Sequence, residues 1–132
     1  MTEIGGRRLG LLVDDYSDAR EMYSEYLKLC GFEVDQATNG VEAIQRASDA
    51  LPDIIVMDLS LPVMDGCEAT RRLKADARTA QIPVLALTGY LGSRMADAAA
   101  QAGCDAFVAK PCLPEVLASK IRLLLGLPPS SI

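Results

Sequence analysis

The sequence predicts an α/β domain in which helices cover both faces of a five-stranded parallel sheet. Five short apolar runs alternate with five segments of helical periodicity, a pattern typical of parallel sheets. The run at 54–57 (IIVM) is unbroken, as in a strand that is buried on both faces. A chain of 132 residues that is 50% hydrophobic supplies one full core. We assign 1–6 to a flexible N-terminus, 7–126 to the domain and 127–132 to a tail.

Each expected strand ends on polar or turn-forming residues. The strands are placed at 8–13, 33–37, 54–58, 83–87 and 106–109. The second strand is the most polar and is predicted to lie at an edge. Right-handed crossovers with helices on both faces favour the strand order 2-1-3-4-5. The first and third strands then lie side by side at the point where ligands bind in open α/β sheets.

The expected helices lie between these strands and after the last one, at 17–30, 40–50, 66–74, 91–102 and 114–125. Ser17 or Asp18 is predicted to cap the first helix, with Glu21 completing a capping box. Leu113 is a poor N-cap for the last helix. Helical spacing places Ala19, Met22, Tyr26 and Cys30 of the first helix, and Val41, Ile44 and Ala47 of the second, toward the core.

Composition excludes several classes of function. The net charge of -5 argues against direct binding to nucleic acid or to an anionic membrane. No apolar run reaches the ~18 residues of a membrane span, and a signal-peptide pattern is missing. Four cysteines without a CxxC pair, in a chain without histidine, make a zinc site improbable. We therefore expect reduced cysteines and a cytoplasmic protein.

Four of the expected strands end on side chains that do not suit a core. These residues are Asp14 with Asp15, then Asp58, Thr88 and Lys110. The carboxyl ends of parallel strands share one edge of the sheet, so these side chains should meet in one pocket. Clustered carboxylates repel one another unless they bind a hard cation such as Mg²⁺.

This set of side chains suits phosphoryl transfer. One carboxylate can act as a nucleophile toward phosphorus and form an aspartyl phosphate. The Lys110 ammonium would neutralise phosphoryl oxygens, and the Thr88 hydroxyl could donate a hydrogen bond to one of them.

Together, the motifs identify a resemblance that extends over the ordered length of the chain. They are the Asp14-Asp15 pair after the first strand, DLSLPVMDG at 58–66, LTG at 87–89 and FVAKP at 107–111. In combination they resemble the receiver domain of two-component response regulators, with its flavodoxin-like or CheY-like (βα)5 fold.

The resemblance implies a role for each residue of the cluster. Asp58 would accept a phosphoryl group from a histidine kinase or a histidine phosphotransfer protein. Asp15, Asp58 and the Ser60 carbonyl would ligate Mg²⁺ or Mn²⁺, with Asp14 acting through water. Lys110 would pair with the phosphoryl group. Such a domain catalyses only its own phosphorylation and dephosphorylation, and in that sense is not an enzyme.

The resemblance also implies a switch. Thr88 would be its hydroxyl and Phe107 its aromatic residue, and the Lys110–Pro111 bond is expected to be cis. Residues 88–125 would then form the surface that contacts a downstream target, with a second copy of the chain as one candidate partner. Phe107 stands where many members have tyrosine, so its inward position would depend on packing alone.

Ser60 and Tyr90 lie two positions after Asp58 and Thr88, where they would flank the path of a hydrolytic water. Neither supplies a carboxylate or amide to orient that water, so we expect slow dephosphorylation. Cys112 replaces the bulkier apolar residue that usually follows the Lys-Pro pair, and we interpret it as a small buried side chain.

Three other interpretations stay open. A phosphatase of the haloacid dehalogenase type needs two acids spaced two apart, whereas Asp14 and Asp15 are adjacent. A flavodoxin-like carrier needs a hydroxyl-rich phosphate loop, and the loop after the first strand is acidic. A degenerate receiver would bind partners without phosphorylation, which the complete acid, Thr and Lys set disfavours. Only 22 residues follow Lys110, so we expect either a stand-alone regulator or a receiver cut from a larger protein such as a hybrid kinase.

Overall fold

The computed structural model describes residues 8–89 and 93–128. Within them, five parallel strands form one sheet in the order β2-β1-β3-β4-β5, which confirms the predicted topology. The strands are β1 (Leu9–Val13), β2 (Glu33–Ala37), β3 (Ile54–Asp58), β4 (Val84–Thr88) and β5 (Ala106–Ala109). The polar strand β2 lies at one edge, as its composition indicated.

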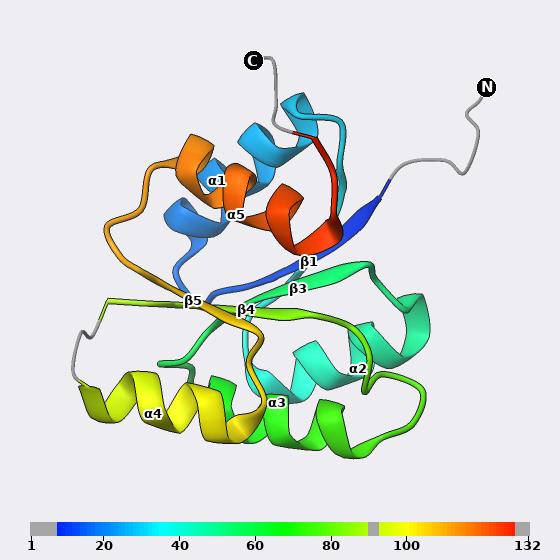
Figure 1. Cartoon of the computed structure of the whole chain (residues 1–132), viewed down its shortest axis with the longest axis vertical. Helices are drawn as coiled ribbons and strands as arrows, with labels where there is room; N and C mark the ends of the chain where they lie inside the picture. The colour runs from blue at the N-terminus through cyan, green and yellow to red at the C-terminus, as the bar shows by residue number, and fades with distance from the viewer. Residues whose placement is uncertain (1–7, 90–92, 129–132) are drawn as a thin grey trace.

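Five helices cover the sheet in the described part of the chain. They are α1 (Ser17–Leu29), α2 (Gly40–Ala50), α3 (Gly66–Ala75), α4 (Ser93–Ala102) and α5 (Pro114–Leu125). Figure 1 shows α1 and α5 on one face and α2, α3 and α4 on the other. The start that we predicted for the fourth helix, at 91, lies outside the described residues.

The core has two halves, one on each face of the sheet. One half joins Leu11, Ile55 and Ala86 to side chains of α2, α3 and α4. The other joins Leu12 and Leu85 to side chains of α1 and α5. Every residue of β3 and β4 is buried, which explains why these strands read as unbroken apolar runs.

Two predictions about α1 are wrong. Its N-cap is Tyr16, and among the described residues no side chain caps it, so neither Ser17 nor Asp18 has the predicted role. Its inner face carries Tyr23, which is buried, whereas Met22 is 44% exposed. A tyrosine side chain is amphipathic, so the sequence alone does not indicate whether it is buried. The carbonyl that accepts a hydrogen bond from this hydroxyl, and so allows its burial, belongs to a distant segment.

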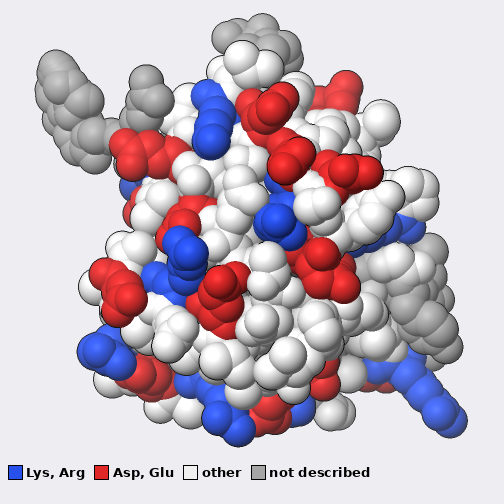
Figure 2. All heavy atoms as spheres, turned by 180° about the vertical axis from the view of Figure 1, so that it is seen from behind, with Lys and Arg blue, Asp and Glu red and all other residues white. Residues whose placement is uncertain are grey.

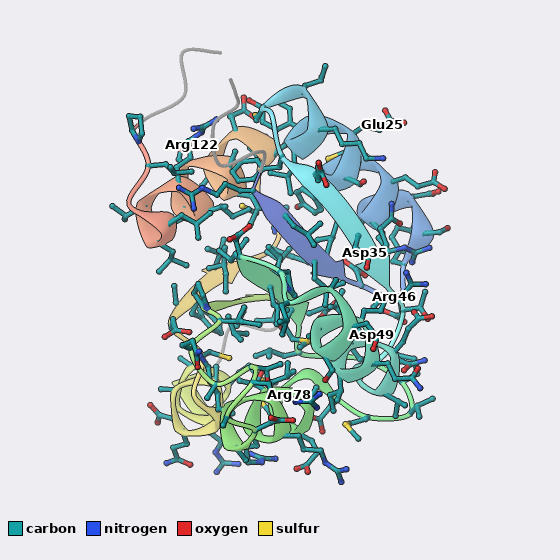
Figure 3. The ribbon with its side chains drawn as sticks, turned by 90° about the vertical axis from the view of Figure 1, so that its right-hand side faces the viewer. Glu25, Asp35, Arg46, Asp49, Arg78 and Arg122 are labelled. Carbon is teal, nitrogen blue, oxygen red and sulfur yellow. The ribbon has the colours of Figure 1, made fainter. Side chains whose placement is uncertain are left out.

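The inner face of α2 differs from the prediction at one position. Ala47 is buried and Ile44 packs against the core as predicted, but Val41 is 42% exposed and Ala43 is buried instead. The side chain of Asn39 caps this helix by accepting a hydrogen bond from a backbone amide of its first turn. An ion pair of 2.8 Å between Arg46 and Asp35 ties the outer side of α2 to β2 (Figure 3).

Several local predictions are confirmed. The Lys110–Pro111 peptide bond is cis. Leu113 precedes α5 without a side-chain cap among the described residues. All four cysteines are free thiols, and Cys112 is buried.

The surface carries charges of both signs. Acidic and basic side chains are interspersed over the face seen in Figure 2. None of the helices in the described part of the chain is both long and apolar enough to span a bilayer.

Candidate functional site

Three carboxylates gather at the carboxyl edge of the sheet. Asp58 ends β3, and Asp14 and Asp15 follow β1 directly. Each offers one carboxylate oxygen, and these oxygens all lie within 4.8 Å of one another. Asp14 and Asp58 are buried, whereas Asp15 is exposed. The acids predicted from sequence to meet therefore do so, with one of them open to solvent.

Lys110 lies between the two buried acids. Its Nζ is 3.0 Å from Asp14 Oδ2 and 3.0 Å from Asp58 Oδ2. Its backbone amide donates to the Thr88 carbonyl oxygen at 2.7 Å, which fixes the end of β5 against the end of β4. One ammonium group therefore serves two carboxylates, which leaves the cluster with an excess of negative charge.

Burial and hydrogen bonds set the proton affinities of the site. Burial raises the pKa of Asp58 above its ordinary value, although the Ser60 amide and the Lys110 ammonium partly oppose it. Burial alone would lower the pKa of Lys110, but its hydrogen bonds to Asp14 and Asp58 outweigh burial and raise it. The charged form of Lys110 is therefore favoured by its two partners, whereas burial disfavours the charged form of Asp58.

The loop from β3 to α3 packs tightly under the site. A β-carbon at Gly66 would collide with the Asp58 carbonyl oxygen, so the helix can begin this close to the strand only with glycine. The Gly66 amide donates to the Leu59 carbonyl oxygen at 3.1 Å. Within the loop, Met64 donates to the Pro62 carbonyl oxygen at 2.7 Å, and Val63 between them has a φ of 68°.

The predicted switch residues occupy neighbouring strands. Thr88 ends β4, is fully buried and takes part in a polar interaction. Phe107 lies on β5, pairs with Ala86 in the sheet register and packs, partly buried, against the core half that includes α4. Phe107 is therefore packed without a hydroxyl contact, and its fully inward position stays a prediction.

The predicted dephosphorylation positions are only partly described. Ser60 is exposed, and its amide donates to Asp58 Oδ1 at 2.9 Å. The role predicted for its carbonyl, as a metal ligand, stays a prediction. Tyr90 lies outside the described residues.

Two residues of α1 that support the site were missed by the sequence reasoning. Arg20 Nη1 donates to the Asp14 carbonyl oxygen at 2.8 Å, and its Nε donates to Gln36 at 2.9 Å. The Tyr23 hydroxyl donates to the Cys112 carbonyl oxygen at 2.7 Å. The first contact is local, because Arg20 lies six residues after Asp14. No local pattern signals the second, because its partners are 89 residues apart.

Three exposed apolar side chains lie on loops that follow strands of the sheet. Tyr16, Val63 and Leu113 follow β1, β3 and β5 and are 62%, 84% and 63% exposed. Apolar side chains on loops at this edge of the sheet can contribute contact area to a docked protein.

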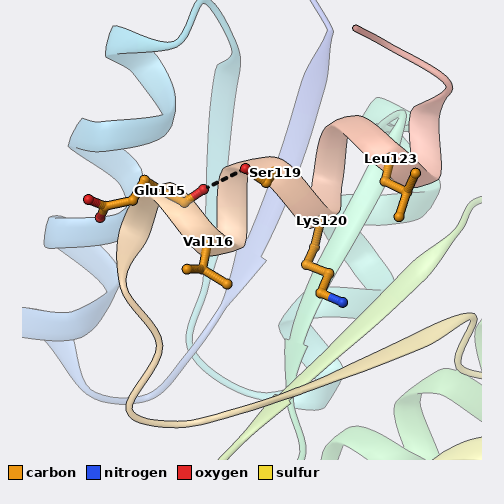
Figure 4. Close-up of a pocket in the computed structure, with 5 residues that line it drawn as sticks. All are labelled: Glu115, Val116, Ser119, Lys120 and Leu123. Carbon is orange, nitrogen blue, oxygen red and sulfur yellow. Dashed lines mark hydrogen bonds between the residues drawn. The ribbon is translucent and has the colours of Figure 1, made fainter. Parts of the chain in front are cut away.

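A separate groove lies on the outer side of α5 (Figure 4). It is lined by Glu115, Val116, Ser119, Lys120 and Leu123. The Ser119 hydroxyl donates to the Glu115 carbonyl oxygen at 3.0 Å, and no residue of the acidic cluster lines the groove. This groove belongs to the surface predicted from sequence to contact partners.

Comparisons with known proteins agree with this geometry. Residues 11–122 match the family described as the response regulator receiver domain. The chain is 39% identical over 119 residues to the response regulator Rre1 of Synechocystis, covering 88% of this chain but 51% of Rre1. It is 31% identical over 116 residues to the polar-differentiation response regulator DivK of Brucella anthropi, covering 88% of this chain and 94% of DivK. The chain thus spans about half the length of one relative and nearly all of the other.

A solved structure shares the fold. The receiver domain of the sensor histidine kinase PA1611 from Pseudomonas aeruginosa superposes with a TM-score of 0.85 at 29% identity, covering 92% of this chain and 99% of that one. That structure holds a magnesium ion coordinated in its active site cleft.

Proposed function

This chain belongs to the response regulator receiver domain family, and on that premise we propose that Asp58 accepts a phosphoryl group from a phosphohistidine of a partner protein. An oxygen of the Asp58 carboxylate forms a bond to phosphorus as the bond from phosphorus to the donor imidazole nitrogen breaks. That nitrogen leaves with the bonding electron pair and takes up a proton, so the donor histidine is regenerated. The product is an acyl phosphate on Asp58, and the chain acts only on itself.

The observation that carries this proposal is the contact of Lys110 with Asp58. The ammonium is 3.0 Å from the carboxylate that would react and is held there by Asp14 on its other side. A cation in this place can follow the charge from the carboxylate to the phosphoryl oxygens as the bond forms. Because the Asp58 carboxylate is buried, little water has to be displaced before it reacts.

The three acids fit a hard divalent cation. Their oxygens converge within 4.8 Å, and oxygen ligands of this kind suit Mg²⁺ or Mn²⁺. When bound, the cation would offset the repulsion between the carboxylates and the incoming phosphoryl group. Asp15, Asp58 and the Ser60 carbonyl would hold it directly, and Asp14, already paired with Lys110, would act through water.

We infer that phosphorylation is read out through Thr88 and Phe107. Thr88 is buried at the end of β4, one strand away from Asp58, and its hydroxyl can turn toward a phosphoryl group. Space vacated by Thr88 becomes available to Phe107 on β5, which is only partly buried. Two alternative packings of this kind transmit a local charge change to a surface. The surface is formed by residues 88–125, and its partner is a downstream protein or a second copy of the chain.

The donor would dock on the loops around the site. Tyr16, Val63 and Leu113 expose apolar surface on the loops after β1, β3 and β5, at the edge of the sheet from which a phosphotransfer partner has to approach the acids. A histidine kinase or a histidine phosphotransfer protein in the cytoplasm is the expected donor.

A phosphotransfer screen tests the proposal. Purified histidine kinases and phosphotransfer proteins carrying labelled phosphohistidine are mixed with the wild-type chain and with Asp58→Asn. Label should move rapidly to the wild type from at least one donor and never to the variant. Label on the variant would contradict the assignment of Asp58. Partner binding without labelling of the wild type would favour a degenerate receiver.

A further inference from the structure

A buried hydrogen bond joins α1 to the loop that follows Lys110. The Tyr23 hydroxyl donates to the Cys112 carbonyl oxygen at 2.7 Å, and Tyr23 and Cys112 are 4% and 8% exposed. Burial raises the pKa of Tyr23, so the hydroxyl keeps its proton at neutral pH and acts as a donor. The contact connects positions 89 residues apart.

Hydrogen bonds to the backbone hold the segment that carries the lysine on both sides of Lys110. On one side, the Lys110 amide donates to the Thr88 carbonyl oxygen at 2.7 Å. On the other side, two residues further on, the Cys112 carbonyl is held by Tyr23. The lysine side chain is a flexible four-carbon stem, so the place of its ammonium depends on how firmly this backbone is anchored.

The helix that supplies Tyr23 also holds one of the two acids that pair with the lysine. Arg20, one turn before Tyr23, donates to the Asp14 carbonyl oxygen at 2.8 Å. The same helix therefore contacts the backbone of Asp14 and the backbone of Cys112, two residues after Lys110. A rigid element that contacts both sides can set the distance between them.

We propose that Tyr23 is a positioning residue for phosphoryl transfer, holding Lys110 where its ammonium reaches Asp14 and Asp58 together. This inference rests on the proposed function of Asp58. Without the hydroxyl, the buried Cys112 carbonyl loses its partner, and the loop relaxes toward water to satisfy it. The ammonium then moves away from the carboxylate and phosphoryl oxygens whose negative charge it stabilises during transfer.

The test compares the rates at which acetyl phosphate modifies wild type, Tyr23→Phe and Tyr26→Phe in the presence of Mg²⁺, followed by intact-mass spectrometry. We expect Tyr23→Phe to react about tenfold more slowly, because a misplacement of ~1 Å can cost up to about a hundredfold. Tyr26 lies on the same helix three residues on, beside Cys30, and Tyr26→Phe removes the same atom without touching the Lys110 loop. Its rate should equal that of wild type.

A double-variant cycle separates positioning from general stability. If Tyr23 acts through Lys110, then Tyr23→Phe should slow modification in the wild-type background but not in Lys110→Ala. Equal slowing in both backgrounds, or no slowing in the wild type, would overturn the inference. Rates are measured at a temperature where circular dichroism shows every variant folded.

The proposed function has its own readout in the same experiment. Wild type that is modified at Asp58, together with unmodified Asp58→Asn, supports the function whatever Tyr23 does. Modification of Asp58→Asn to the same extent as wild type would reject the function itself.

Discussion

The ammonium of Lys110 lies 3.0 Å from Asp58 Oδ2, yet the pKa of Asp58 is raised rather than lowered. Burial of the carboxylate is the larger effect, and the lysine divides its charge between Asp58 and Asp14. The metal-free site is therefore strained electrostatically when Asp58 is ionised. This strain has consequences for stability that can be measured.

We expect Asp58→Asn to raise the thermal midpoint of the metal-free protein at pH 7. The substitution removes a buried negative charge beside Asp14 and Asp15, and each like-charge contact costs ~1 kcal/mol even when it is screened as strongly as in bulk water. The side-chain amide introduced by the substitution keeps an oxygen that can accept a hydrogen bond from the Ser60 amide. Melting curves in EDTA measure the shift, with Asp15→Asn as a matched control for an exposed acid of the same cluster. A midpoint that is unchanged or lower would show that the acids are not crowded.

The difference in stability between Asp58→Asn and wild type should increase with pH. Because the folded pKa of Asp58 lies above its ordinary value of 3.8, the folded state binds its proton more tightly than the unfolded state. The stability contributed by this group is therefore fully present below about pH 3.8 and is lost as pH rises through the folded pKa. Over that interval, the free energy of unfolding of Asp58→Asn should rise relative to that of wild type. Above it, the difference between the two proteins should stay constant. An advantage that is largest at the acid end of the titration would contradict this sign.

Metal removal should abolish chemical phosphorylation. Three convergent carboxylates and one lysine leave an excess of negative charge, so an anionic donor needs a divalent cation before it can enter. Acetyl phosphate with Mg²⁺ or Mn²⁺ should add one phosphoryl group to wild type, and EDTA should prevent it. Mg²⁺ should also raise the thermal midpoint of wild type by mass action. Equal modification with and without EDTA, by intact mass, would exclude a metal role.

The sequence predicts the fold more completely than it predicts the side-chain contacts that support the site. Strand order and the meeting of Asp58 with Lys110 follow from periodicity and from one rule about parallel sheets. The inner face of α1 was assigned through Met22 instead of Tyr23, because a buried hydroxyl is tolerable only with a partner. That partner is a backbone carbonyl at Cys112, which a local pattern cannot reveal.

Val63→Gly should stabilise the protein. Val63 has a φ of 68°, where a β-branched residue is strained, and such conformations cost about 1–3 kcal/mol. Glycine removes that cost but adds about 0.5–1 kcal/mol of entropy to the unfolded chain. We expect a net gain of about 1 kcal/mol, seen as a higher midpoint in thermal melts. Leu51→Gly is the matched control away from the site, since Leu51 has a φ of 48° and is also exposed. A lower midpoint for Val63→Gly would mean that contacts of the valine outweigh its backbone strain.

The output surface should respond to a phosphoryl mimic. Beryllofluoride bound at Asp58 with Mg²⁺ would draw Thr88 toward it and let Phe107 move inward. Amide hydrogen exchange should therefore change in residues 88–125, including the exposed side of α5 around Val116 and Leu123. Asp58→Asn treated in the same way should show no change there. Changes confined to the loops after β1 and β3 would contradict coupling to this surface.

The phosphorylated state should decay slowly, and two substitutions should shorten its life. Ser60 is exposed, and its amide is already donated to Asp58 Oδ1 at 2.9 Å, so its small hydroxyl is the only side-chain group that it can offer to a water. Tyr90, two positions after Thr88 in the sequence, likewise brings no carboxylate or amide. A group that accepts a proton from the water and fixes it in line with phosphorus contributes about 10²–10⁴-fold when fully placed.

Ser60→Asn combined with Tyr90→Glu supplies an amide and a carboxylate that can bind the water. We expect about tenfold faster loss of the phosphoryl group, which is less than the full contribution of a well-placed group. The protein is phosphorylated with acetyl phosphate, the donor is removed by gel filtration, and the fraction still modified is followed by intact mass. Ser60→Ala with Tyr90→Phe is the control that changes the same positions without adding a water-binding group, and it should decay as wild type does. If the Asn and Glu variant also decays at the wild-type rate, these positions do not place the hydrolytic water. The lifetime would then be set by how Lys110 and the metal ligands shield the phosphorus.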